Sequence, residues 1–488
     1  MYSLSMKYDV VVIGAGAGGL VVAIGCAKAG KKTLMIEQGN YGGDCTNFGC
    51  VPSKSLIASA DAAHHIDKAS DVGIELNDVK EQSDQALERV RKIVSFIRSH
   101  ENAEALQKHG IDTLTAKASF KDPHTLLVKD ATGKVQEVQG KKIIIAAGSH
   151  PFVPPIDGLK DTPYLTNETI FDLKSVPNRL IILGGGPIGC ELAQAFQRIG
   201  SQVTLIHKHS ELLQREPEEA SKILMEAMKS DGIEFEMNAE TKKVHFSDQE
   251  FSLQVEQEGK VKEIRGDQLL TSVGRRPNLK DLELDAAEIK CTDQGICIDN
   301  YARTSTSNIF AIGDITGPPF FTHRAEYHGR TVLTSLLLPG PFMKRLDKKQ
   351  PIPRVTYTDP EIASIGLLEK DAIEQFGDYG VATYKIPFSE VDRAICQGRT
   401  EGMIIIVTRK WSSQILGATI IGPRAGEMLL EISVAIHAKF PLKKLAQIIH
   451  PYPTYNQGIR KAADLWLTRT ILPSILKFFG KNGKRKEK

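Results

Sequence analysis

Two cysteines, Cys45 and Cys50, stand within residues 42–54, with four residues between them and glycines on either side. A thiol pair at this spacing can accept electrons as a disulfide and pass them on by thiolate attack. Half of a zinc site has similar spacing, but zinc needs a second pair or histidines, and the only other close pair is Cys291 and Cys297. Two unrelated buried thiols are the other alternative. We favour a redox-active pair and expect no metal ligands.

The residues before this pair have the pattern of a dinucleotide-binding unit. The continuous apolar run 8–13 predicts a buried parallel strand, and a glycine-rich turn, an apolar helix and a second strand at 32–36 follow, ending in Glu37. In such a unit the glycines let the backbone approach a pyrophosphate at the helix N-terminus, and the acid binds ribose hydroxyls. The fingerprint glycines are Gly14, Gly16 and Gly19.

The same unit recurs later in the chain. A strand at 180–183, a glycine-rich turn, a helix and a strand at 202–206 repeat the order, and one constant offset superposes Glu37 on His207. Two dinucleotide sites in one chain imply two nucleotides that exchange electrons, with the thiol pair close to the first. The glycines of the second fingerprint are Gly184, Gly186 and Gly189.

Composition sets broader bounds. A chain of 488 residues predicts about three domains. A net charge of +3 without a basic stripe over the body argues against a nucleic-acid partner. Seven cysteines in this length do not form a secreted disulfide framework. The first strand begins almost at once, no secretory segment is visible, and we expect a cytoplasmic protein.

These features together resemble the flavin-dependent pyridine nucleotide–disulfide oxidoreductases, which include dihydrolipoamide dehydrogenase, glutathione reductase and mercuric reductase. The resemblance covers about residues 8–463. The end of the cysteine segment, Pro52-Ser53-Lys54, is more similar to the lipoamide and mercury branches than to the glutathione branch. The segments that carry the resemblance are the two fingerprints, the cysteine segment, Ala147-Gly148, residues 271–278 and residues 312–314.

The resemblance implies an α/β fold with two Rossmann-like domains, for FAD and for NAD(P), and a C-terminal α+β dimerisation domain of a homodimer. Proline-rich segments at 151–155 and 351–353 mark crossovers between domains. The expected domains are an FAD domain at 1–150 and 276–350, an NAD(P) domain at 151–275, a dimerisation domain at 351–464 and a tail at 465–488.

The resemblance also assigns roles around the thiols. It makes Cys45 the thiol that meets substrate and Cys50 the thiol that faces the flavin. Lys54 follows Cys50 by four residues and shares its helical face, so its cation would stabilise a thiolate. Glu191 matches the family glutamate that pairs with this lysine; compensation of a helix dipole is the alternative.

Asp314 matches the aspartate that holds the flavin ribityl chain, with a helix cap as the alternative. The remaining positions expected to bind cofactor are Gly43, Ala118, Ala147, Gly148, Gly274 and Ala325.

Two departures from the family pattern stand out. In the second unit, His207 and Lys208 occupy the place of the acid. This exchange favours NADPH over NADH, because cations can pair with a 2′-phosphate, and Arg215 would assist. A solvated basic turn is the alternative interpretation. Near the C-terminus, Tyr452 and Gln457 stand where members acting on thiols carry a histidine base and a glutamate.

Tyrosine titrates near pH 10, so Tyr452 is a poor proton shuttle at neutral pH. Mercuric reductases also carry a tyrosine there, but the chain lacks their C-terminal cysteine pair and their N-terminal metal-binding domain. His450 matches a first histidine of some lipoamide enzymes, and two roles are open to it: substitute base or turn cap.

The tail is apolar over 465–479 and then basic. Arg469, Pro473 and Lys477 interrupt the apolar stretch, so it cannot cross a bilayer. Packing on the body or disorder is the first expectation, and a membrane-surface helix on the inner face of the membrane is the alternative.

We therefore expect a flavoprotein that passes electrons from NADPH or NADH through FAD and Cys45–Cys50 to a small-molecule or metal-ion acceptor that the sequence does not identify. Dihydrolipoamide dehydrogenase is the alternative enzyme. A membrane-associated redox sensor or partner-binding flavoprotein with little turnover is the alternative of another class.

Overall fold

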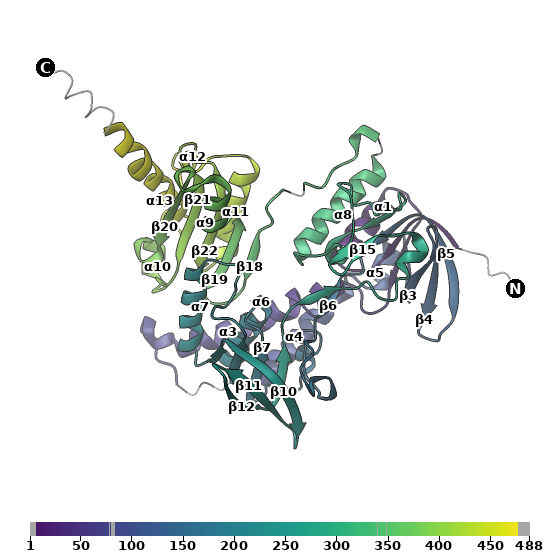
Figure 1. Ribbon diagram of the computed structural model, residues 1–488, viewed down its shortest axis with the longest axis horizontal. Helices are drawn as coiled ribbons and strands as arrows, with labels where there is room; N and C mark the ends of the chain where they lie inside the picture. Colours follow the sequence, from purple (N-terminus) through teal and green to yellow (C-terminus); the bar gives the residue numbers. More distant parts are fainter. Residues whose placement is uncertain (1–5, 78, 80–82, 339, 348, 477–488) are drawn as a thin grey trace.

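The computed structural model describes residues 6–476, apart from residues 78, 80–82, 339 and 348. Figure 1 shows three lobes, with the two ends of the chain at opposite sides of the molecule. Each lobe is built on its own main sheet. The predicted α/β class, with two Rossmann-like units and a C-terminal α+β domain, is confirmed.

The first lobe combines a parallel sheet with an antiparallel meander. Its six strands have the order β1-β2-β3-β4-β5-β17, and β1 also pairs with β5. They are β1 (Met6–Ile13), β2 (Thr33–Glu37), β3 (Ile111–Asp122), β4 (Thr125–Asp130), β5 (Val135–Ile145) and β17 (Ile309–Ala311). The parallel strands are continuous apolar runs because both of their faces are covered. The helices α1 (Ala17–Lys28) and α8 (Thr322–Leu337) pack together beside this sheet (Figure 1).

The thiol segment connects this lobe to the second one. The short helix α2 (Gly43–Asn47) leads into α3 (Cys50–Asp67), which begins at Cys50 itself. Pro52 lies in the first turn of α3, where a missing backbone N–H has no intrahelical partner to lose. α3 packs against α4 (Ser83–Ser99) and against α6 (Pro187–Arg198), the first helix of the second lobe. The short helix α5 (Ala103–Lys108) follows α4.

The second lobe repeats the nucleotide-binding unit. Its parallel sheet has the order β13-β7-β8-β9. These strands are β7 (Arg179–Leu183), β8 (Gln202–His207), β9 (Glu234–Met237) and β13 (Gln268–Thr271), with α7 (Glu218–Ser230) between β8 and β9. An antiparallel sheet of β10 (Ala239–Ser247), β11 (Glu250–Gln257) and β12 (Lys260–Gly266) lies beside it.

A two-stranded ribbon stands where the chain enters and leaves this lobe. β6 (Ser149–Pro151) pairs with β14 (Arg275–Pro277), close to the crossovers that the sequence suggested, and we propose the domain boundaries there. A small hairpin of β15 (Cys291–Thr292) and β16 (Gly295–Ile296) follows in the first lobe.

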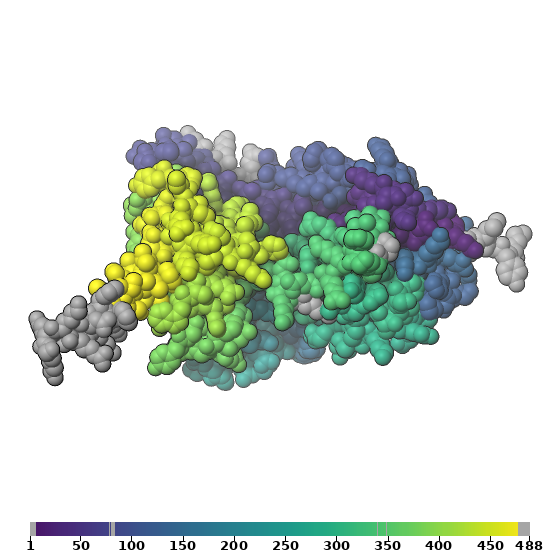
Figure 2. Space-filling view, turned by 90° about the horizontal axis from the view of Figure 1, so that it is seen from above, coloured from purple at the N-terminus to yellow at the C-terminus, as the bar shows by residue number. Residues whose placement is uncertain are grey.

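The third lobe is an antiparallel sheet with helices against it. The strand order is β18-β19-β22-β21-β20. The strands are β18 (Arg354–Thr356), β19 (Glu361–Gly366), β20 (Val381–Pro387), β21 (Met403–Arg409) and β22 (Ile415–Gly422). The helices are α9 (Glu369–Phe376), α10 (Asp392–Cys396), α11 (Ala425–His437), α12 (Leu442–Leu445) and α13 (Gln457–Trp466). Figure 2 shows that this lobe lies against the rest of the molecule rather than apart from it.

An ionic cluster around the buried side chain of Arg198 joins the three lobes beside α3. The guanidinium of Arg198, whose side chain is 5% exposed, contacts Asp231 at 2.9 Å, Asp359 at 3.0 Å and Asp61 at 3.3 Å. Arg399 also pairs with Asp359. Because Asp61 lies on α3 and Asp359 precedes β19, this one cation fixes the thiol helix to the other two lobes.

Replacing Arg198 with Ala should destabilise the protein strongly, because Asp231 would stay buried without its counter-charge. Loss of one partner of a buried pair typically costs about 3–5 kcal/mol. The measurement is the shift in the urea unfolding midpoint. The matched control is Arg330→Ala, which removes an exposed helical ion pair with Glu326 and should change stability by under about 0.5 kcal/mol. Equal shifts for both variants would contradict the role given to Arg198.

Candidate active site

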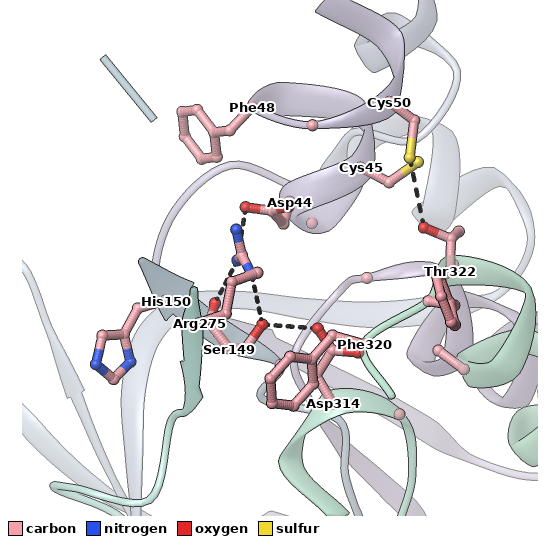
Figure 3. Close-up of a pocket in the computed structure, with 18 of the residues that line it drawn as sticks. Asp44, Cys45, Phe48, Cys50, Ser149, His150, Arg275, Asp314, Phe320 and Thr322 are labelled. Atoms are coloured by element: carbon pink, nitrogen blue, oxygen red, sulfur yellow. Dashed lines mark hydrogen bonds and ion pairs between the residues drawn. The ribbon is translucent and has the colours of Figure 1, made fainter. Parts of the chain in front are cut away.

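The two thiols of the sequence motif lie together. Figure 3 shows the sulfurs of Cys45 and Cys50 side by side, Cys45 on α2 and Cys50 at the start of α3. Both are free thiols in this structure. Their mutual hydrogen bond is the largest cause that lowers the pKa of Cys50 to about 6, and it raises the pKa of Cys45. Of the two sulfurs, Cys50 is therefore the one stabilised as a thiolate, and Cys45 is the one that favours the protonated form.

Thr322 is a functional residue that the sequence did not reveal. It is the first residue of α8, and its Oγ1 lies 3.6 Å from the sulfur of Cys50 (Figure 3). Its hydroxyl lowers the pKa of Cys50 further, because it donates to the charged sulfur. Since Thr322 is remote in sequence from both cysteines, no local pattern could have pointed to it.

Lys54 and Glu191 form the predicted pair. Lys54 Nζ lies 2.7 Å from Glu191 Oε2, and the Glu191 side chain is 7% exposed. The other carboxylate oxygen accepts the backbone N–H of Tyr357 at 2.9 Å, and the Tyr357 ring lies 4.4 Å from Lys54 Nζ. Glu191 lies in the second turn of α6 and is fully bonded, so compensation of the helix dipole does not explain it. The cation of Lys54 also lowers the pKa of Cys50.

The first fingerprint forms one end of a cavity of about 1530 Å³, larger than the ~300–1,000 Å³ of most small-molecule pockets. Gly16 and Gly43 approach so closely that a Cβ on Gly43 would stand 2.5 Å from Gly16 Cα. The N-terminus of α1 has no side-chain cap and lines the cavity, which leaves its N–H groups for an anion. Glu37 accepts N–H groups from Ala15 and Gly39, at 2.8 Å each, and keeps lone pairs for hydroxyls.

Asp314 begins a chain of hydrogen bonds that reaches Asp44, the residue before Cys45. Ser149 donates to its carboxylate at 2.6 Å, Arg275 Nε donates to Ser149 Oγ at 2.9 Å, and Arg275 Nη2 donates to Asp44 at 3.0 Å (Figure 3). Burial raises the pKa of Asp314. Side-chain hydrogen bonds therefore place the carboxylate within the cavity, and the same bonds tie α2 to the ribbon of β6 and β14.

Most of the predicted cofactor residues share this cavity. Those that line it are Gly14, Gly16, Glu37, Gly43, Lys54, Ala118, Ala147, Gly148, Lys208, Gly274, Asp314 and Ala325. Those that do not are Gly19, Gly184, Gly186, Gly189 and His207. Gly19 and Gly189 have a packing role, because a Cβ would stand 2.2 Å and 1.9 Å from the carbonyl oxygens of Gly14 and Gly184. The two fingerprints therefore fit two dinucleotides. Their glycines allow close packing of the backbone, and the N-termini of α1 and α6 have no side-chain cap.

His207 is not the cation that the sequence suggested. Its Nδ1 accepts the backbone N–H of Gly185 at 3.0 Å, the contact that Glu37 makes to Ala15 in the first unit. Burial, with a smaller contribution from neighbouring cations, lowers its pKa to about 4, so the ring is neutral at pH 7. The positive charge at this end of the cavity comes from Lys208 and Arg215, both exposed along its wall.

His450 has a structural role in this subunit. Its Nε2 lies 2.9 Å from Glu431 Oε1, its Nδ1 lies 2.9 Å from the Ile448 carbonyl, and its side chain is 5% exposed. With both ring nitrogens engaged, it fixes the loop before α13. The role of substitute base or turn cap for His450 stays a prediction; Glu431 is the partner that the sequence did not reveal.

Tyr452 and Gln457 also have defined partners. The Tyr452 hydroxyl donates to Asp392 at 2.9 Å, and this hydrogen bond raises the pKa of Tyr452, which makes it a still poorer acid near neutrality. The ring itself is 72% exposed. Gln457 Nε2 donates to the carbonyls of His450 and Pro451 at 3.1 and 3.2 Å. In the described subunit neither side chain lines the cavity.

Comparisons with known proteins agree with this site. A family model described as pyridine nucleotide-disulphide oxidoreductase matches residues 8–329, and the model of its dimerisation domain matches residues 352–463. The chain belongs to this family. It is thus an oxidoreductase that uses FAD and NAD(P)H, with a redox-active cysteine pair, and the dimerisation domain supports a homodimer.

Individual relatives fall on two branches. The chain is 32% identical over 466 residues to a mercuric reductase of Lysinibacillus sphaericus, covering 94% of this chain and 84% of that protein. It is 33% identical over 470 residues to a dihydrolipoyl dehydrogenase of Geobacillus stearothermophilus, covering 96% and 98%. Among solved structures, the Cu(II) complex of the HOCl-induced flavoprotein disulfide reductase RclA from Escherichia coli is similar, with a TM-score of 0.84, 27% identity and coverage of 94% and 99%.

The Thr322 hydroxyl should hold down the pKa of Cys50, and the thiolate can be followed in a Cys45→Ser background by its long-wavelength absorbance beside oxidised flavin. That band should be present above the Cys50 pKa and disappear as the pH falls through it, because protonation removes the donor charge. Thr322→Val removes a hydrogen bond to a charged group, worth about 1.5–3 kcal/mol, so the midpoint should rise by about 1–2 pH units.

The control for this titration is Thr334→Val on the same helix. The Thr334 hydroxyl donates to the Arg330 carbonyl, away from the thiols. An unchanged midpoint in Thr322→Val, or the same shift in the control, would show that the 3.6 Å contact does not tune the thiolate.

Proposed function

We propose that this protein is an NADPH-dependent reductase of a thiophilic metal ion, of the kind represented by Hg(II) and Cu(II). The observation that supports the proposal concerns the loop before α13, which we call the C-terminal loop: its side chains already have hydrogen-bond partners. Tyr452 is bonded to Asp392, and His450 is engaged at both ring nitrogens. In the described subunit neither side chain projects from this loop as a free base for protonating a leaving thiolate.

Reduction of a soft metal ion needs no such base. The Cys45 thiol and the Cys50 thiolate supply two electrons, the Cys45–Cys50 bond forms, the one thiol proton passes to solvent, and Hg(II) becomes Hg(0). Sulfur is the ligand that soft ions prefer. Among the described residues no group of three or more His, Cys, Asp or Glu side chains could hold a resident metal ion, so the thiol pair itself is the proposed binding site.

The residues of the chain divide the remaining work. The first fingerprint, Glu37 and Asp314 would hold FAD, which would supply the two-electron chemistry between nicotinamide and disulfide. Cys50 is the sulfur that receives these electrons, because it is the one stabilised as a thiolate by Cys45, Thr322 and Lys54. Cys45 retains its proton and is free to meet the acceptor. The names of the mercuric reductase relatives and of the Cu(II) complex of RclA support this acceptor class.

Dihydrolipoamide oxidation is the second candidate, and one observation favours it. His450 and Glu431 form an imidazole–carboxylate pair at 2.9 Å in the same loop as Tyr452. A protein that only senses redox state would differ from both enzymes, because it would accept electrons from NADPH without sustained turnover.

A panel of acceptors separates these functions. The parent protein should oxidise NADPH with a thiophilic metal ion, whereas lipoamide and glutathione disulfide should be poorer substrates than for ordinary family members by about 10²–10⁴-fold, the usual value of acid–base help. Tyr452→His with Gln457→Glu should raise disulfide turnover. The control is Tyr379→His, the same change at an exposed tyrosine elsewhere. Efficient lipoamide turnover by the parent protein would overturn the proposal in favour of His450.

Preference for NADPH should depend on Lys208 and Arg215, with His207 neutral. Replacing both cations with Met should lower kcat/KM for NADPH by roughly tenfold or more and leave NADH nearly unchanged, since each charge-assisted phosphate contact is worth about 1.5–3 kcal/mol. Lys222→Met is the control, because Lys222 is exposed on the same lobe and pairs with Glu218. A parent protein that uses both nucleotides equally would refute the preference.

A further inference from the structure

The two cations on which the proposed NADPH preference depends lie in one loop. It spans residues 208–217, between β8 and α7, and contains Lys208 and Arg215. Bends and turns make up the loop, so neither a helix nor a strand ladder holds its backbone. The direction in which these cations point therefore depends on the contacts that the loop makes with the rest of the protein.

The middle of the loop is held by the second lobe itself. The side chains of Leu212 and Leu213 are buried, and the backbone N–H of Leu213 donates to the Gly185 carbonyl at 2.9 Å. Leu213 has a φ of 49°, a left-handed conformation that is uncommon for residues other than glycine. Such a conformation persists only where the surrounding contacts fix it. The path of the loop beside the glycine turn is therefore closely specified.

The end of the loop is held by the third lobe. Arg354, on β18, donates from Nη2 to the backbone carbonyl of Arg215 at 2.9 Å, and its guanidinium pairs with the carboxylate of Glu216. Ser364, on β19, donates to the same carboxylate. The Glu216 side chain is only 7% exposed and that of Arg354 22%, so the pair is largely shielded from water. Figure 1 shows α7, which begins after this loop, beside β18 and β19.

Two consequences follow for Arg215. The hydrogen bond to its carbonyl fixes the point from which its side chain extends. The ion pair neutralises Glu216, the next residue along the chain. If Arg354 were absent, a shielded carboxylate would be left without its counter-charge, and the adjacent Arg215 would serve in its place. An arginine paired in this way would be lost to a phosphate, and the carboxylate would repel the phosphate as well.

We propose that Arg354 is a positioning residue for coenzyme selection, which neutralises Glu216 and so keeps Arg215 available for the 2′-phosphate of NADPH. Arg354 does not line the cavity, so it acts through Arg215 rather than on the nucleotide. The inference rests on the proposed preference for NADPH. It extends the determinants of that preference from the nucleotide-binding lobe to the third lobe.

The test measures binding of NADP⁺ and NAD⁺ to the full-length flavoprotein by titration calorimetry. Arg354→Met should raise the Kd for NADP⁺ by about tenfold or more, the value of one charge-assisted contact, and leave the Kd for NAD⁺ nearly unchanged. Arg354→Met with Glu216→Gln should recover most of the affinity for NADP⁺, because no carboxylate then competes for Arg215. The limiting rate of flavin reduction at saturating NADPH should be the same in both variants and the parent.

The matched control is Lys385→Met. Lys385, on β20, pairs with Glu219 of α7, so it joins the same two lobes without touching the loop. This variant should leave both dissociation constants unchanged.

Three results would overturn the inference: an unchanged Kd for NADP⁺ in Arg354→Met, an equal loss for NAD⁺, which would indicate a general structural role, or no recovery in the double variant. A parent protein that binds both nucleotides equally would refute the proposed preference and this inference together. The identity of the acceptor does not enter, because no acceptor is present in these measurements.

Discussion

The ion pair between Lys54 and Glu191 is the interaction on which the rest of the site depends. It joins α3 of the first lobe to α6 of the second, and Glu191 is too buried to remain charged without a partner. The Tyr357 backbone satisfies its other oxygen, so the third lobe contributes as well. Because Lys54 lies one turn after Cys50, the contact that packs the lobes together also places a cation near the reactive sulfur. The Lys54–Glu191 ion pair therefore serves both the packing of the lobes and the position of the cation near Cys50.

A second contact holds α3 further along its length. The buried guanidinium of Arg198 contacts carboxylates from α3, from the end of α7 and from the segment before β19. A helix fixed at two points has little freedom to rotate or slide, and rotation would carry Cys50 away from Thr322. The distance of 3.6 Å between those two side chains is thus maintained by contacts well removed from it.

Local patterns in the sequence predicted much of the fold and the electron path. The glycine turns, the apolar strands and the cysteine spacing are signals within a few residues, and each predicted the element that is observed. The missing parts are long-range pairings. Thr322, Tyr357 and Glu431 have no periodic signature, because their roles arise only when distant segments meet. His207 shows the limit of comparing residue types. Its ring makes the same kind of backbone contact as Glu37 in the first unit, and it does not supply a positive charge there.

In the C-terminal loop, the histidine lies two residues before the expected position of the base, and its surroundings differ from those of that position. His450 has an imidazole and a carboxylate partner, which are the components of a proton relay, but its second nitrogen is bonded to the Ile448 carbonyl and its side chain is enclosed. The position that projects outward belongs to Tyr452, whose hydroxyl is held by Asp392. In the described subunit the two thiols and Lys54 thus lie together, while His450, Tyr452 and Gln457 each have hydrogen-bond partners within the third lobe. The proposed acceptor, which takes electrons without a proton, matches that arrangement.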